Sequence, residues 1–172
     1  MQGRVGFHLL FLLSLLLRVQ AGERSTHTEA VMSLAWNSEY RNVLASGSAD
    51  TSILIWDVAL GKANSEIAKH TGKVQALAWN PHESHVLLSA AFDKKVMIHD
   101  VRDSSQKPTK WKIEHDAEAC AWDLHSHANF FVSTEAGVVY AMVRAMRCDA
   151  MRCYTNCLFF GARAVVCMYV HS

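Results

Sequence analysis

The segment HTEAVMSLAWNSEYRNVLASGSADTSILIWDV at residues 27–58 recurs 43 positions later as HTGKVQALAWNPHESHVLLSAAFDKKVMIHDV at residues 70–101. The two segments align without a gap and share fourteen identical residues, far more than chance gives. Trp36, Trp79 and Trp122 carry the same 43-residue spacing into a third, weaker unit. Self-similarity at a fixed period of about 20–50 residues indicates a repeat architecture. The sequence therefore predicts a chain built from similar, stacked structural units.

Each unit has the pattern of short β-strands separated by polar turns. In the first unit, the strand candidates are residues 31–36, 43–48 and 52–58, with a weaker fourth at 63–69. Their apolar side chains lie on both faces, so each sheet must be covered on both faces. Sheets packed around an axis provide this cover, and a 43-residue period with four strands is typical of a propeller blade.

The number of units predicts an open structure. Residues 27–143 hold about 2.7 units, whereas closed propellers typically use about 4–8 blades. We therefore expect an all-β, partial β-propeller of two to three four-stranded antiparallel blades that does not close. Its expected repeat region is 27–145, with units 27–69 and 70–112 and a degenerate unit 113–145. Because end blades leave apolar faces uncovered, we expect the chain to associate or aggregate.

The first unit carries residues by which the chain resembles the WD40 repeat family. They are His27, Ser46, Asp50, Trp56 and Asp57. They stand where that family places its histidine, its serine, its turn aspartate and its Trp-Asp dipeptide. The resemblance implies a structural clamp that runs from the aspartate through the histidine and serine to the tryptophan. A buried indole N–H is a donor that needs such an acceptor.

The second unit keeps this pattern with one replacement. Its members are His70, Ser89, Asp93, His99 and Asp100, so that a histidine stands at the family's tryptophan position. The glycine that usually precedes the family's histidine is absent from both units.

The third unit keeps only its repeat tryptophan, Trp122. Ala136 stands at the register of Asp50, and Met142 stands at the register of Trp56. We expect this unit to lack the polar clamp.

Serine, histidine and aspartate in one unit also suggest a hydrolase. A catalytic serine needs an exposed, strained turn and donors for an oxyanion, and the sequence contains no Gly-x-Ser-x-Gly motif. We therefore predict no catalytic residue, no cofactor and no small-molecule substrate.

The WD40 resemblance implies a non-enzymatic scaffold that binds proteins through loops and blade surfaces. Within that family, the segments above are most similar to a nuclear and nucleolar protein of rRNA processing and ribosome biogenesis. The implied partners are proteins of pre-ribosomal or chromatin-associated complexes. The candidate contact residues lie in the turns and are Glu39, Tyr40, Arg41, His82, Glu83 and His85.

The sequence contains few features of a nucleic-acid or metal site. A net charge of +1 gives no global field for nucleic acid. Lys107, Lys110 and Lys112 surround Trp111, and this patch would either contact RNA or form an outer strand whose tryptophan packs on the next blade. A loose cluster of ligand-type residues has no paired zinc spacing, and we expect no metal there. Its members are His115, Cys120, His125 and His127, with Asp116 and Asp123 nearby.

The two ends depart from the repeat. Residues 1–21 resemble a secretory signal peptide, with Arg4, an apolar run over 7–17 and small residues before Gly22. This run is too short for a stable membrane span. It leaves open the alternative of a secreted or lumenal binding module. Residues 146–172 form a Cys-rich tail with no assigned structure and no deducible disulfide pairing.

Overall fold

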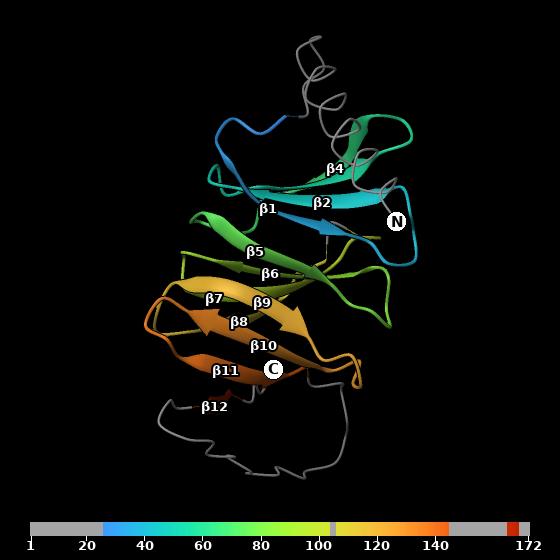
Figure 1. The fold of residues 1–172 in the computed structure, drawn as a ribbon. Helices are drawn as coiled ribbons and strands as arrows, with labels where there is room; N and C mark the ends of the chain where they lie inside the picture. Colours follow the sequence, from blue (N-terminus) through green and yellow to red (C-terminus); the bar gives the residue numbers. More distant parts are fainter. Residues whose placement is uncertain (1–25, 104–105, 145–164, 169–172) are drawn as a thin grey trace, which may run out of the picture.

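The computed structural model describes residues 26–103, 106–144 and 165–168. These residues form three four-stranded sheets and no helix (Figure 1). The first sheet contains β1 (Val31–Trp36), β2 (Val43–Ser48), β3 (Ile53–Asp57) and β4 (Lys62–Ile67). The second contains β5 (Val74–Trp79), β6 (Val86–Ala91), β7 (Lys95–Asp100) and β8 (Thr109–Lys112). The third contains β9 (Ala117–Trp122), β10 (Asn129–Thr134), β11 (Val139–Val143) and β12 (Val165–Met168).

The strands of each sheet follow one another in space as they do in the chain. In the first two sheets every neighbouring pair is antiparallel, as the sequence predicts. The third sheet differs, because β12 pairs with β11 in parallel. This strand comes from the segment to which sequence analysis assigned no structure. A parallel outer strand requires a long connection, and the segment between the two strands supplies it.

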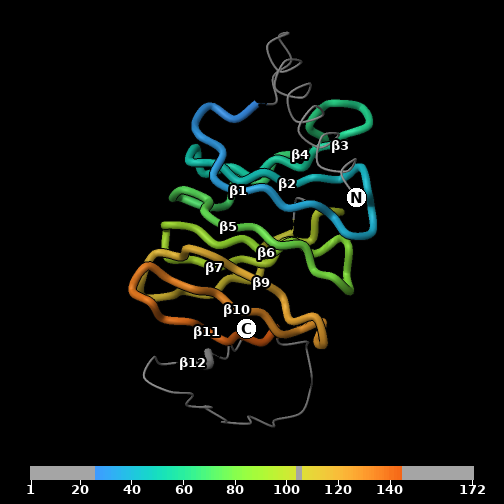
Figure 2. Tube along the Cα trace, viewed as in Figure 1, coloured from blue at the N-terminus to red at the C-terminus, as the bar shows by residue number. Residues whose placement is uncertain are grey.

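The three sheets stack in chain order, with β1, β5 and β9 side by side along one edge (Figures 1 and 2). Two apolar layers hold the stack together. The layer between the first and second sheets contains Ala35, Ala45, Ile53, Ile55 and Ile67 with Val74, Leu77, Trp79 and Leu87. The layer between the second and third sheets includes Leu88, Val96 and Trp111 with Phe130, Val132 and Tyr140. The first and third sheets lie at opposite ends of the stack, so the expected open all-β arc of blades is confirmed.

Corresponding turns in the three sheets place one residue in a left-handed conformation. Thr51 has φ of 71°, Lys94 has φ of 59° and Gly137 has φ of 74°, and these positions are spaced by 43. Glycine adopts this conformation without steric cost, whereas a β-branched threonine is strained there. The first two sheets therefore need interactions that hold this turn, and the third does not.

Candidate functional site

The polar residues of the first unit form one hydrogen-bonded network. The indole N–H of Trp56 donates to Ser46 Oγ at 2.8 Å, and Ser46 Oγ lies 2.7 Å from His27 Nε2. His27 Nδ1 lies 3.1 Å from Asp50 Oδ2. One tautomer satisfies all three contacts, since Ser46 donates to Nε2 when Nδ1 carries the proton that Asp50 accepts. The network joins β2 and β3 to the segment before β1 and to the strained turn.

Asp50 connects this network to the turn itself. The backbone N–H groups of Thr28 and Ser52 donate to its carboxylate at 2.8 and 3.0 Å, and the hydroxyl of Ser52 donates at 2.6 Å. Burial opposes ionisation of Asp50, but the hydrogen bonds from Ser52 and Thr28 outweigh it and hold the pKa of Asp50 well below its usual range. The carboxylate is therefore charged at neutral pH and fixes the conformation around Thr51.

The second sheet repeats the network with a histidine in place of the tryptophan. His70 Nδ1 lies 3.1 Å from Asp93 Oδ1, and His70 Nε2 lies 2.8 Å from Ser89 Oγ. His99 Nε2 also lies 2.8 Å from Ser89 Oγ, at the place of the Trp56 indole nitrogen. Burial lowers the pKa of His99 to about 3, and the neighbouring His70 adds to the shift. His99 is therefore neutral at physiological pH and can donate from Nε2 as an indole does.

The third sheet replaces the network with apolar packing. Ile113, Val132 and Met142 stand at the registers of His70, Ser89 and His99, and all three are buried together. Ala136 stands at the register of Asp93, next to Gly137. Replacing every member of a buried polar network by apolar groups avoids the cost of leaving one member unpaired. The sequence shows this replacement when the 43-residue offset is applied strictly, because the offset places Ile113 at the position of His70. His115, the nearest histidine, lies two residues outside that register.

The serine hydroxyls of the two networks are not accessible to a substrate. Ser46 is 2% exposed and Ser89 is 0% exposed, and each hydroxyl contacts two nitrogen atoms of neighbouring side chains. Each hydroxyl therefore forms part of a buried hydrogen-bond network that links neighbouring strands.

The repeat tryptophans connect neighbouring sheets. The indole N–H of Trp79 donates to the carbonyl oxygen of Ala35 at 3.0 Å, and that of Trp122 donates to the carbonyl of Ala78 at 3.0 Å. Asp57 and Asp100, the aspartates of the Trp-Asp register, instead accept backbone N–H groups of the turns that follow them. Each tryptophan therefore fixes the spacing between two sheets at the strand edge they share.

Two asparagines make a second connection between sheets that sequence analysis missed. Asn37 Oδ1 accepts the backbone N–H groups of Glu39 and Tyr40, while its Nδ2 donates to the carbonyl of Ser84 at 2.7 Å. Asn80 makes the equivalent contacts, and its Nδ2 donates to the carbonyl of His127 at 3.0 Å. The sequence contains a signal for this connection, because Asn37 and Asn80 are identical residues 43 positions apart.

The candidate contact residues in these turns have unequal exposure. Tyr40 is 53% exposed, and Glu39 and Arg41 are also exposed. In the second sheet, His82 Nε2 contacts the carbonyl of Leu124. Glu83 forms an ion pair of 2.9 Å with Arg144, the residue after β11 of the third sheet, and it lies 3.8 Å from His85. The turn of the first sheet is therefore the more available of the two for a partner.

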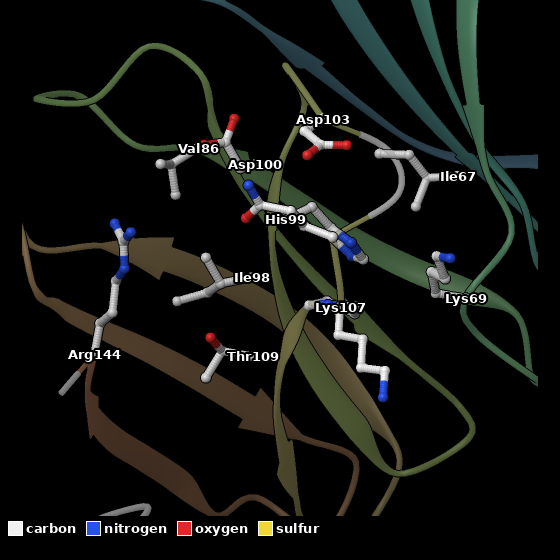
Figure 3. Close-up of a pocket in the computed structure, with 12 residues that line it drawn as sticks. Ile67, Lys69, Val86, Ile98, His99, Asp100, Asp103, Lys107, Thr109 and Arg144 are labelled. Carbon is white, nitrogen blue, oxygen red and sulfur yellow. The ribbon is translucent and has the colours of Figure 1, made fainter. Parts of the chain in front are cut away.

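A cavity of about 120 Å³ opens beside His99 at the outer edge of the second sheet (Figure 3). Lys69, Lys107 and Arg144 are among its lining residues, together with Asp100. Figure 3 shows the lysine side chains on the same side of His99.

The basic-aromatic patch does not present its tryptophan to solvent. Trp111 is 2% exposed and packs edge-on against Phe130 with ring centroids 5.1 Å apart. The flanking Lys110 and Lys112 are exposed. The interpretation as an outer strand packed on the next blade therefore holds, and Trp111 is not placed to stack on an RNA base.

The remaining ligand-type residues are dispersed. Burial raises the pKa of the Cys120 thiol to about 12, which leaves it protonated. Across residues 26–103 and 106–144, no three histidine, cysteine, aspartate or glutamate side chains gather to hold a metal ion. Within the same part of the chain, no helix is long and apolar enough to cross a membrane. The signal-like segment 1–21 lies outside the described residues, as does the Cys-rich tail apart from β12.

Comparison with known proteins matches these repeats. The family model "WD domain, G-beta repeat" matches residues 19–57 and 61–100. The second match begins with β4 of the first sheet and ends with β7 of the second, so one sequence repeat spans two sheets. The chain is 38% identical over 50 residues to the Periodic tryptophan protein 1 homolog of Drosophila melanogaster. It is 48% identical over 42 residues to Periodic tryptophan protein 1 of Saccharomyces cerevisiae.

These similarities cover 29% and 24% of this chain, and only 11% and 7% of the respective relatives. The chain therefore spans a small part of the curated relatives that it matches. WD40 repeats form protein-interaction scaffolds, and the repeats here have the strand order, polar networks and stacked sheets described above. Residues 19–57 and 61–100 thus match two WD40 repeats, and the described residues form the open, all-β stack of a partial WD40 β-propeller.

Proposed function

We propose that the chain is a non-enzymatic scaffold that docks proteins of nuclear pre-ribosomal complexes and thereby acts in rRNA processing and ribosome biogenesis. The observation that carries the proposal is the exposed turn around Tyr40 and Arg41, held on a rigid WD40 blade. The similarity of the repeats to periodic tryptophan proteins supports the choice of complex. The His-Ser-Asp networks act in this proposal as structural clamps that keep the docking surface in one geometry.

The turn has the physical properties of a docking point. Asn37 fixes its backbone through two hydrogen bonds, so little conformational entropy is lost when a partner binds. Tyrosine and arginine are enriched among the residues that dominate binding energy at protein interfaces. Tyr40 and Arg41 therefore offer a pre-organised aromatic and cationic pair to an acidic, partly apolar segment of a partner.

A capture experiment tests the proposal. The full chain, tagged at its C-terminus, is expressed in cells, and its nuclear partners are identified by mass spectrometry with the associated pre-rRNA measured by hybridisation. Tyr40→Ala with Arg41→Ala should reduce capture at least tenfold while leaving the circular dichroism spectrum unchanged. The matched control is Lys62→Ala with Glu66→Ala, which alters exposed residues of the outer strand β4. Equal capture by both variants would place docking elsewhere, and the absence of pre-ribosomal proteins would refute the choice of complex.

The location of the chain is tested separately. Fusion of residues 1–30 to a fluorescent reporter should leave the reporter in the nucleus or cytosol. The first family match begins at residue 19, inside the signal-like segment 1–21. Cleavage before Gly22 would remove the start of that match. Export of the reporter would contradict a nuclear scaffold and favour the secreted or lumenal module instead.

A further inference from the structure

The cavity beside His99 is lined mostly by residues of the second sheet and of the loop that precedes β8 (Figure 3). The second sheet has a neighbouring sheet on each side, so the cavity is not part of an end face of the stack. Its volume of about 120 Å³ exceeds that of one water molecule, whose share of liquid volume is about 30 Å³. The cavity can therefore receive a small chemical group, such as the end of a side chain.

Two lysines at this cavity have no counter-ion. Lys69 and Lys107 line it and are exposed, and neither forms an ion pair within the residues that the structure describes. Burial is the main cause of the low pKa of His99, and the positive charges of Lys69 and Lys110 add to the shift. The wall of the cavity therefore has a positive potential, which favours an anion.

The acidic lining residues do not cancel this potential. The carboxylate of Asp100 lies 2.6 Å from the guanidinium of Arg102, which neutralises it. Figure 3 shows the carboxylates of Asp100 and Asp103 on the side of His99 away from the Lys107 amine. An anion held by that amine is therefore kept apart from both carboxylates.

His99 adds an unused hydrogen-bond acceptor to the cavity wall. The residue is only 4% exposed, and its Nε2 lies 2.8 Å from Ser89 Oγ. When Nε2 carries the proton, the neutral ring has a lone pair on Nδ1. This nitrogen has no hydrogen-bond partner within the described part of the chain. An occupant that satisfies the whole cavity therefore needs negative charge for the lysines and a donor for Nδ1.

We propose that the cavity binds the phosphate monoester of a phosphorylated serine or threonine in an extended segment of a partner protein. A monoester has a charge of about −1.5 to −2 at pH 7 and a second pKa of about 6. It can therefore keep one O–H group for Nδ1 while its other oxygens accept charge-assisted hydrogen bonds from the lysines. A carboxylate or a phosphodiester is ionised at that pH and offers acceptors only.

The strand beside the cavity favours a peptide as the carrier of the phosphate. Thr109 lines the cavity and begins β8, the outer strand of the second sheet. Within the described ranges, no strand pairs with the outer edge of β8, so its backbone groups can pair with an extended segment. Lys110 and Lys112 are exposed on this strand and complement acidic residues that flank the phosphorylated side chain.

The first test titrates the full chain with N-acetyl-O-phosphoserine amide and follows the histidine rings by NMR. The His99 signals, assigned with the His99→Trp variant, should shift and saturate, while those of His27 in the first sheet stay unchanged. Dimethyl phosphate and N-acetyl-aspartate amide, the diester and carboxylate probes, should bind about tenfold more weakly. The proposal is overturned if no probe moves the His99 signals, or if either comparison probe binds as tightly as the phosphoserine probe.

The second test removes the lysines. Lys69→Ala with Lys107→Ala should weaken phosphoserine binding by about tenfold, because both charge-assisted contacts are lost. The matched control is Lys62→Ala with Lys73→Ala, which removes the same charge at exposed positions outside the cavity. Circular dichroism verifies that both variants are folded. Equal affinity of the two variants would show attraction by overall charge and would overturn the site.

Two further comparisons identify the occupant and separate this site from the docking turn. A short acidic peptide with a central phosphoserine should bind more tightly than the single amide, because it also pairs with β8. Tighter binding of inorganic phosphate than of this peptide would overturn a protein as the occupant. Tyr40→Ala with Arg41→Ala should leave phosphoserine binding unchanged, since neither residue lines the cavity. Failure of this site and failure of the proposed docking turn are therefore observed in different measurements.

Discussion

The indole nitrogen of Trp122 lies 3.0 Å from the carbonyl oxygen of Ala78 in the neighbouring sheet. Trp79 makes the same contact with Ala35 one sheet earlier. By contrast, the indole nitrogen of Trp111 is buried and has no hydrogen-bond partner within the described part of the chain. The protein thus contains buried tryptophans that differ in whether the indole N–H forms a hydrogen bond.

This difference allows the bond between sheets to be measured. Trp79→Phe removes both ring volume and a satisfied N–H, whereas Trp111→Phe removes ring volume and an unsatisfied one. We expect Trp79→Phe to lower the free energy of unfolding by about 1 kcal/mol more than Trp111→Phe, the usual net worth of a buried hydrogen bond. Urea denaturation of both variants followed by tryptophan-independent circular dichroism checks this. Equal losses would show that the Ala35 contact adds nothing to stability.

Asp50→Ala should destabilise the first sheet through the strained turn. The substitution removes the acceptor for His27 and for two backbone N–H groups, with an expected loss of about 1–3 kcal/mol. In a Thr51→Gly background the loss should be smaller, because glycine adopts the left-handed conformation unaided. A thermal denaturation double-mutant cycle measures this coupling. If the two effects are simply additive, Asp50 does not act by holding the turn.

The fold was largely predictable from sequence because the repeat is gap-free. Strand bounds at 31–36 and 43–48 coincide with β1 and β2, since turn residues interrupt each apolar run. The parallel strand β12 was not predictable, because it lies outside the 43-residue period and carries no turn signal linking it to β11. Sequence periodicity predicts which strands pair within one repeat unit. It does not predict pairing with a strand that comes from outside the repeat region.

The contacts of the candidate site were predictable only in part. The residue types of the first unit indicated which side chains should meet, but the shared use of Ser89 by His70 and His99 depends on three-dimensional register. Asn37 was overlooked because its side chain satisfies a local turn and a distant carbonyl at once. The local sequence can indicate the hydrogen bonds of Asn37 within its own turn. The bond to the carbonyl of Ser84 can be predicted only when the neighbouring sheet is known.

His99→Trp should be tolerated, whereas His99→Ala should not. Trp56 occupies the corresponding position of the first sheet, and an indole N–H at position 99 can donate to Ser89 as Trp56 does to Ser46. We expect the tryptophan variant to match the wild-type free energy of unfolding within about 1 kcal/mol, and the alanine variant to lose about 1–3 kcal/mol by leaving Ser89 with one partner fewer. Chemical denaturation at pH 7.5 compares them. A tryptophan variant as unstable as the alanine variant would mean that the site cannot admit an indole.

The same position should make stability depend on pH. Burial lowers the pKa of His99 in the folded chain to about 3, against an unfolded value of 6.5. The unfolded chain therefore binds a proton that the folded chain cannot, so the stabilisation is complete above pH 6.5 and decreases as the pH falls toward 3. Between pH 7.5 and pH 5 the free energy of unfolding should fall by about 2 kcal/mol on account of His99.

His99→Trp removes this titration while keeping a hydrogen-bond donor for Ser89, so its unfolding free energy should change less over the same interval. His70, whose pKa burial also lowers, accounts for the dependence that remains. The pKa values of Asp50 and Asp93 are lowered from 3.8 in the folded chain. The stabilisation from these two carboxylates is therefore lost mainly as the pH falls below about 4, outside the interval measured. Urea titrations at pH 7.5, 6 and 5 on both proteins give the two slopes. Identical slopes would mean that His99 is not the buried neutral group that its surroundings require.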